Sequence, residues 1–210
     1  MSIAAAPRRP VLADLIARPS DHARAFALDA GLVVAGAAFV CLLAQVEIPL
    51  WPVPITGQTL AVVVVGAALG ARRGAAALIT YLLAGLAGLP VFAGFTGSIA
   101  AVAKPSFGFV IGFVFAAYVA GWFAERAWDR KPVLAFVGFV AASAIPFAFG
   151  IPYLAFILNV VGGGSFGIAE ILDLGLWPFV VGGLVKAAVA ALLIPAAWAG
   201  VRAVDRSKRG

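Results

Sequence analysis

The stretch from Phe107 to Ala124 reads FGFVIGFVFAAYVAGWFA and contains no charged residue. Because a helix needs about 20 predominantly apolar residues to cross the hydrocarbon core of a bilayer, this run has near-spanning length. Backbone amides in lipid must bond within the protein, so only helices and closed barrels span membranes. The apolar residues do not alternate with polar ones, which favours a helix over a barrel strand. The stretch therefore predicts an all-α membrane protein.

The composition of the whole chain supports this class. Hydrophobic residues make up 64% of the 210 residues and charged residues 11%, whereas charged residues are about a quarter of a soluble domain. A first apolar run begins near residue 28, and it is longer than the roughly 7–15 apolar residues of a signal-peptide core. We expect this run to be retained as a span of a single membrane domain.

Four further runs of near-spanning length and one short run surround the opening stretch. They are Leu28–Ile48, Gly74–Ala93, Pro132–Gly150 and Leu174–Val201, with Thr59–Ala71 as the short run. The basic residues between the runs share one face only if the short run also crosses, which makes the number of spans even. We expect residues 28–201 to form a six-helix membrane domain between a cytoplasmic N-terminal segment, 1–27, and a basic cytoplasmic tail, 202–210.

With six spans, 13 of the 15 basic residues lie on one face. They are Arg8, Arg9, Arg18, Arg24, Arg72, Arg73, Arg126, Arg130, Lys131, Arg202, Arg206, Lys208 and Arg209. The positive-inside rule makes this face cytoplasmic, so we expect a multi-pass protein of the bacterial inner membrane with both termini in the cytoplasm. The two exceptions are Lys104 and Lys186.

Several function classes are excluded by what the sequence lacks. The basic residues do not form one patch, so nucleic acid is not an expected partner despite a pI near 10.1. One histidine, His22, and one cysteine, Cys41, cannot supply a disulfide framework, a His-rich metal site or a Cys-His catalytic pair. No phosphate-binding Gly-x-x-x-x-Gly-Lys-Ser/Thr loop occurs. We therefore expect neither an enzyme nor a cofactor site, and any ATP to be used by partner subunits.

The segments on the outward face are apolar and rich in Pro and Gly. They are 51–55 (WPVPI), 92–95 (FAGF) and 151–156 (IPYLAF). Irregular backbone at membrane depth is tolerated only where protein or a cavity satisfies it, so the three segments together favour outer loops that close a ligand cavity. For any single aromatic residue, anchoring at the membrane interface is an equal alternative.

A few polar residues stand out beside this face. Lys186 lies within the last run, where a lysine costs about 2.5–3.5 kcal/mol and needs a partner. That partner is a ligand carboxylate, unless the side chain extends to the head groups. Gln58 and Thr56 offer an amide and a hydroxyl where a helix begins, although a cap explains them equally well. Asn159 and Tyr153 are polar handles, and bonding between helices is the alternative for Asn159.

Two ridges of small residues four apart allow close helix contact. One comprises Gly108, Gly112, Ala116 and Ala120, and the other Ala23, Ala27, Gly31 and Ala35. For the first ridge we expect packing inside the protein. For the second, contact with a separate membrane subunit is an open possibility.

The motifs around these residues resemble those of the BioY family, the biotin-binding S components of energy-coupling factor (ECF) transporters. The resemblance rests on 53–56 (VPIT) with 58–62 (QTLAV), 69–74 (LGARRG), 88–94 (GLPVFAG), 108–109 (GF), 112–113 (GF), 150–154 (GIPYL), 178–179 (PF) and Lys186, in register over roughly residues 30–200. Two positions depart from the family pattern. Gly183 stands where an Asp is common, and 104–107 (KPSF) replaces a commoner Gly-Pro-Thr-Gly.

The resemblance implies six helices, a biotin pocket closed by the loop between spans 1 and 2, and high-affinity biotin uptake. It implies a membrane-embedded T component and two ATPase subunits as partners, beside membrane lipid, although some members are thought to work without that module. Further copies of the chain are another potential partner, and an ion- or proton-driven carrier of a small anionic solute is the alternative function. We expect substrate contacts from Lys186, Gln58, Thr56, Trp51, Phe92, Tyr153 and Asn159, and partner contacts from Ala27, Gly31 and Ala35.

Overall fold

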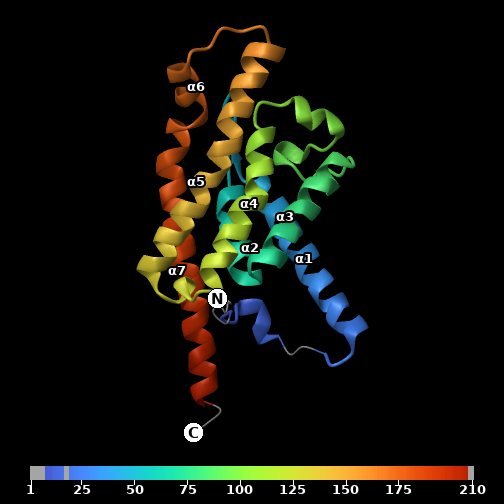
Figure 1. Ribbon diagram of the computed structural model, residues 1–210, viewed down its shortest axis with the longest axis vertical. Coiled ribbons are helices and arrows are strands. Elements are labelled where there is room, and N and C mark those ends of the chain that lie inside the picture. Colours follow the sequence, from blue (N-terminus) through green and yellow to red (C-terminus); the bar gives the residue numbers. More distant parts are fainter. Residues whose placement is uncertain (1–7, 17–18, 208–210) are drawn as a thin grey trace, which may run out of the picture.

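The computed structural model describes residues 8–16 and 19–207, and it is mostly helical (Figure 1). Within these residues seven α-helices follow one another: α1 (His22–Ala44), α2 (Gln58–Leu69), α3 (Ala71–Leu86), α4 (Phe107–Ala124), α5 (Pro132–Phe156), α6 (Ile168–Gly175) and α7 (Trp177–Ser207). Two short strands, β1 (Glu47–Ile48) and β2 (Ile55–Thr56), form an antiparallel hairpin between α1 and α2. In the described part of the chain, four stretches are long and apolar enough to cross a membrane: His22–Ala44, Phe107–Ala124, Pro132–Val161 and Ile168–Val204. The mostly helical membrane architecture predicted from the sequence is therefore confirmed.

The helices α2 and α3 are shorter than a full span. They contain 12 and 16 residues, which correspond to about 18 Å and about 24 Å of helix against a hydrocarbon core of about 30 Å. The two helices run in opposite directions and meet at Gly70, whose φ of 86° suits glycine. The six-span count therefore remains a prediction.

Helix boundaries differ from the apolar runs where a specific residue starts or stops a helix. The first helix begins at His22 rather than Leu28, because the Asp21 carboxylate caps it by accepting from Ala23 N at 3.0 Å. The third ends at Leu86 rather than Ala93, because Gly88 has a φ of 102° and a proline follows. In α4 the boundaries coincide with those of the apolar run.

An irregular turn follows α5, and a break in the backbone divides the last apolar run, Leu174–Val201. Helix α5 contains two prolines in its interior, Pro146 and Pro152, and passes into a π-helical turn, η5 (Ile157–Val161). Between α6 and α7 the backbone breaks at Leu176, with φ −124° and ψ −64°. A proline within a helix removes one backbone donor, so neighbouring protein must satisfy the freed carbonyl groups.

The core forms where α2 lies against α4, with α5 on the other side of α4. A Cβ on Gly66 would lie 2.3 Å from the Ala117 carbonyl oxygen, so only glycine permits this approach. The ridge 108–120 on α4 is buried, and a Cβ on Gly112 would lie 2.5 Å from Cα of Pro146 on α5. The prediction that this ridge packs inside the protein is confirmed.

Ion pairs join the N-terminal segment to the helix ends beside it. Asp14, within the 3-10 turn η1 (Leu12–Leu15), accepts from Arg8 at 3.0 Å and from Arg73 of α3 at 2.9 Å. Arg73 also pairs with Asp29 of α1 at 2.9 Å, and Arg8 with Glu125 at 3.3 Å. Burial works to raise the pKa of Asp14, but the Val11 backbone amide and the two guanidinium groups outweigh it and lower the pKa.

Of the basic residues counted above, Arg18, Lys208 and Arg209 lie outside the described residues, and so does the side chain of Arg206.

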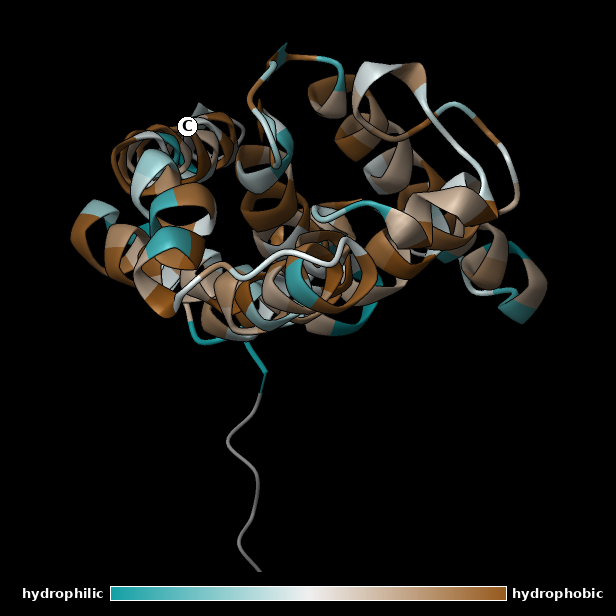
Figure 2. Cartoon of the chain, turned by 90° about the horizontal axis from the view of Figure 1, so that it is seen from above, coloured by the Kyte–Doolittle hydropathy of each residue, from teal (hydrophilic) through white to brown (hydrophobic). Residues whose placement is uncertain are grey.

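The outer surface of the helices is strongly apolar. Seen from above, the helices are mostly hydrophobic, with hydrophilic residues in short patches (Figure 2). Large apolar side chains such as Phe26, Leu42 and Leu192 are exposed on the surface. Exposed apolar surface on this scale is unusual for a soluble monomer and suits contact with lipid tails.

Candidate functional site

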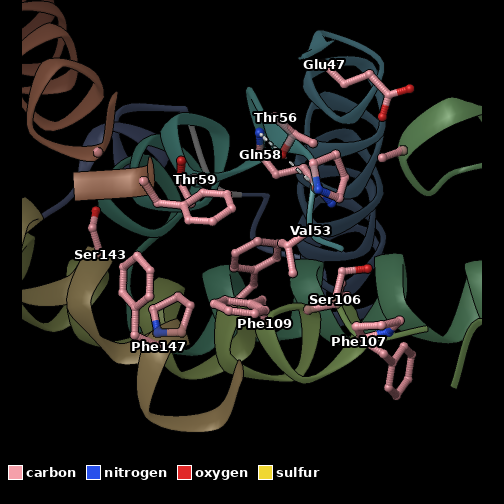
Figure 3. Close-up of a pocket in the computed structure, with 18 of the residues that line it drawn as sticks. Glu47, Val53, Thr56, Gln58, Thr59, Ser106, Phe107, Phe109, Ser143 and Phe147 are labelled. Carbon is pink, nitrogen blue, oxygen red and sulfur yellow. Dashed lines mark hydrogen bonds between the residues drawn. The ribbon is translucent and has the colours of Figure 1, made fainter. Parts of the chain in front are cut away.

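A cavity of about 480 Å³ lies among α2, α4, α5 and α7, where the hairpin and the segment between α3 and α4 meet them. This volume falls within the range of about 300–1,000 Å³ that is usual for small-molecule sites. Aromatic rings form much of the wall: Phe92, Phe107, Phe109, Phe113, Phe147 and Phe179. Phe107, Phe109 and Phe147 are labelled in Figure 3. A mostly apolar wall with a few polar groups is typical of a small-molecule site.

The hairpin turns its proline-rich tip toward the cavity. Glu47 pairs with Thr56 and Ile48 with Ile55, which fixes the register of the two strands. Pro52 and Val53 are buried and line the cavity. Trp51, the neighbouring residue that the sequence singled out, is 70% exposed and does not line the cavity.

Lys186 on α7 places its ammonium at the cavity wall. Its Nζ donates to the backbone carbonyl oxygen of Thr56 on β2 at 2.5 Å. None of the ion pairs within residues 8–16 and 19–207 includes Lys186. An ammonium has three N–H donors, so two remain for a ligand after the bond to Thr56.

Gln58 organises the cavity wall beside this bond. Its side chain is 5% exposed; its Oε1 accepts from Thr56 Oγ1 at 2.8 Å and its Nε2 donates to the Tyr81 hydroxyl at 2.7 Å. The Tyr81 ring in turn contacts Phe92 edge-on, with ring centroids 5.4 Å apart. The structure thus brings Thr56, Gln58 and Phe92 to the cavity together with Lys186.

Tyr153 and Asn159 lie outside the residues that line the cavity. The Tyr153 hydroxyl donates to the Val102 carbonyl, and its ring lies 6.1 Å from that of Phe107. Asn159 closes the loop after the π-helical turn, because its amide bonds both backbone groups of Phe166, at 3.1 and 2.7 Å. Both side chains hold segments near the cavity without facing it.

Sequence reasoning missed several polar residues of the wall. They are Glu47, Thr59, Lys104, Ser106 and Ser143. Tyr81, which supports Gln58, was also missed, although a single phenol in the apolar run 74–93 was a usable signal. Gly183 borders the cavity, and a Cβ there would meet no described atom within 4 Å.

The small-residue face of α1 points away from the rest of the bundle. Ala27, Gly31 and Ala35 are all exposed, and a Cβ on Gly31 would meet no described atom within 4 Å. The opposite face is packed, since a Cβ on Gly36 would lie 3.0 Å from Ala77 Cβ on α3. One face of α1 therefore packs against the bundle, and the face with the small residues is exposed.

Comparison with known proteins identifies the family. The BioY family profile matches residues 18–203. The biotin transporter BioY of Rhizobium etli is 40% identical over 174 residues, covering 80% of this chain and 87% of that protein. The biotin transporter BioY of Thermotoga maritima is 36% identical over 156 residues, covering 74% of this chain and 87% of that protein.

A solved structure confirms the fold. The crystal structure of the S-component for biotin from an ECF-type ABC transporter superposes with a TM-score of 0.67 at 22% sequence identity, covering 84% of this chain and 93% of that chain. The resemblance read from the motifs is confirmed by the family profile and by both relatives. This chain belongs to the BioY family.

Proposed function

We propose that this chain binds biotin with high affinity in the cavity and takes part in its uptake across the cytoplasmic membrane. The observation that carries the proposal is the Lys186 ammonium at the wall of an aromatic cavity, with no acidic partner among the described ion pairs. The relatives from Rhizobium etli and Thermotoga maritima are both named biotin transporters, not enzymes.

The chemistry of the wall suits the two ends of biotin. The carboxylate of the valerate chain pairs with the Lys186 ammonium, and the fused rings lie among the phenylalanine side chains. A charge-assisted hydrogen bond fixes the acid end, and apolar burial supplies the rest of the affinity. The hairpin tip at Pro52 and Val53 covers the ligand.

Translocation needs an energy source, and the sequence contains no phosphate-binding Gly-x-x-x-x-Gly-Lys-Ser/Thr loop. The name of the similar S-component structure links it to an ECF-type ABC transporter, so we assign a T component and two ATPase subunits as partners. The exposed face with Ala27, Gly31 and Ala35 on α1 suits the T component, because small residues allow close helix contact in lipid.

The proposed topology has six spans, with α2 and α3 as shorter passes and both termini in the cytoplasm. Asp14 and Glu125 hold Arg8 and Arg73 together at one end, which supports a shared cytoplasmic face for these segments. Labelling with an impermeant thiol reagent tests the topology in Arg126→Cys, with Cys41 replaced by Ala. Reaction from outside intact cells would exclude the six-span arrangement.

A binding titration tests the proposed function. Purified protein in detergent should bind biotin, and it should bind the neutral amide of biotin more weakly. Uptake in cells should stop when ATP is depleted while the membrane potential is maintained. Uptake that follows the potential instead would favour an ion-driven carrier, and absence of biotin binding would refute the proposal.

A further inference from the structure

A short turn between α3 and α4 forms part of the cavity wall. Phe92, Ala93 and Thr96 of this turn line the cavity. Phe92 N donates to Thr96 O at 2.8 Å, and Thr96 N donates to Phe92 O at 3.3 Å. These two bonds close the turn on itself, but they do not fix its position relative to the helices. Contacts with other elements must therefore hold the turn at the cavity.

The side chain of Gln45, the residue that follows α1, supplies such contacts. Its Nε2 donates to Phe92 O at 3.2 Å, and its Oε1 accepts from Phe95 N at 2.9 Å. Nε2 also lies 3.0 Å from Cys41 O, one turn back in α1, and 3.4 Å from Val91 O. Both ends of one amide thus bind one turn, and the bond to Cys41 fixes the amide on α1.

The ring of Phe92 has a separate seat on α3. A Cβ on Gly85 would lie 2.1 Å from this ring, so the ring occupies the space that a side chain at Gly85 would fill. The Tyr81 ring contacts it edge-on, and the Phe92 side chain is 7% exposed. The helix α3 therefore holds the ring, and Gln45 holds the backbone that carries it.

We propose that Gln45 is a positioning residue for ligand binding, because its amide holds Phe92 at the cavity wall. Gln45 is not among the described residues that line the cavity, so it acts on the ligand through Phe92. A neutral amide can donate to the Phe92 carbonyl and accept from the Phe95 amide at once, whereas a carboxylate only accepts and a thioether donates nothing. The inference rests on the proposed function, which makes biotin the ligand that Phe92 contacts.

A double-mutant cycle tests the inference by biotin titration of Gln45→Met, Phe92→Ala and the variant with both changes. Gln45→Met should weaken biotin about 2- to 12-fold, since binding must then order the turn at about the cost of one neutral hydrogen bond. Gln45→Glu should weaken it at pH 7 as well. In the Phe92→Ala background Gln45→Met should cost nothing further, because the ring that it positions is gone.

Thr80→Val is the matched control for the loss of a bond from a side chain to the backbone. The Thr80 hydroxyl donates to the Ala76 carbonyl at 2.9 Å, and the residue does not line the cavity. If Gln45→Met and Gln45→Glu weaken biotin no more than Thr80→Val does, Gln45 positions nothing for the ligand. Full additivity of Gln45→Met and Phe92→Ala would also overturn the inference, while biotin binding by the wild type would stand.

Deuterium exchange of the wild type gives a test that needs no variant. The side chain of Phe95 is 71% exposed, and its backbone amide bonds the Gln45 side chain. Saturating biotin should slow exchange of this amide, because a ligand stabilises the arrangement that it binds. Unchanged exchange in protein that binds biotin would contradict the role of Gln45 alone. A wild type that binds no biotin would refute the proposed function and this inference with it.

Discussion

The Lys186 ammonium on α7 lies 2.5 Å from the backbone carbonyl oxygen of Thr56 on β2, 130 residues earlier in the chain. This bond ties the hairpin at the mouth of the cavity to the helix that forms its far wall. Gln58 holds the Thr56 hydroxyl from the other side at 2.8 Å. One cation therefore both orders the hairpin and faces the ligand.

The first prediction concerns the order of the hairpin. In the ligand-free protein, Lys186→Met should speed deuterium exchange of the hairpin amides, such as Gly57 N bonded to Val46 O at 2.8 Å, about 10-fold or more. The reason is that a hydrogen bond to a charged group contributes about 1.5–3 kcal/mol. Lys104→Met, which removes a lysine bonded to Thr96 instead, should leave the hairpin unchanged. In the wild type, added biotin should slow exchange further, and equal exchange with and without biotin would contradict the proposal that the hairpin tip covers the ligand.

The second prediction concerns Tyr81. Tyr81→Phe leaves the buried Nε2 of Gln58 without its acceptor, which should cost about 1–3 kcal/mol and lower the melting temperature by about 2–10 °C. Tyr118→Phe is the matched control, because Tyr118 is exposed. Equal melting temperatures of the two variants would show that the Gln58–Tyr81 bond does not stabilise the fold.

The third prediction concerns the exposed face of α1. Gly31→Leu should reduce co-purification with the T component by about 10-fold or more, because a bulky side chain prevents close helix contact. Biotin affinity should stay within about 2-fold of the wild type, since Gly31 lies away from the cavity. Ala141→Leu, at an exposed position on α5, should alter neither property. Loss of biotin binding with intact assembly would refute the partner face.

The fourth prediction concerns a buried acid beside α5. Asp129, in the turn η4 (Trp128–Arg130), is fully buried; its Oδ2 accepts from Trp198 Nε1 at 2.5 Å, and its Oδ1 has no partner among the described atoms. Burial raises the pKa of Asp129 despite the bonds that oppose it. The folded state therefore favours the protonated acid, so stability from this group is present below the unfolded pKa and is lost as the pH rises through the folded pKa.

Asp129→Asn should accordingly raise the melting temperature at pH 8 by a few degrees, because one unit of pKa corresponds to about 1.4 kcal/mol. The gain should vanish near pH 4, where the unfolded chain begins to bind the same proton. Asp173→Asn, at an exposed position, should show no such dependence. A gain of equal size at both pH values would contradict the assignment to Asp129.

The sequence predicted the helices well because lipid leaves few alternatives. The run from Phe107 to Ala124 became a helix with the same boundaries, since a long apolar run in a bilayer must bond its own backbone. The predicted helix boundaries were wrong where a single residue starts or ends a helix regardless of the apolar pattern. Asp21 caps the start of α1, and Gly88 forms the turn after α3.

The site was harder to predict, because spacing along a loop does not give side-chain direction. Pro52 and Val53 face the cavity, whereas the adjacent Trp51 is exposed. Both the N–H and the oxygen of the Asn159 side-chain amide bond the backbone of its own loop. A sequence does not distinguish a polar side chain that bonds its own loop from one that is free to bind a ligand. Lys186 could be found, because a cation in an apolar run needs a partner wherever it lies.

The measurement that tests the account most directly compares biotin with its neutral amide in the wild type and in Lys186→Met. The wild type should prefer the acid, and Lys186→Met should weaken biotin about 10- to 150-fold and lose that preference, because the variant forfeits a charge-assisted hydrogen bond. Lys186→Arg should recover part of the affinity, since the planar guanidinium group keeps the positive charge but occupies more space than an ammonium. If Lys186→Met still prefers the acid by the same factor as the wild type, the carboxylate is held elsewhere and the central claim is wrong.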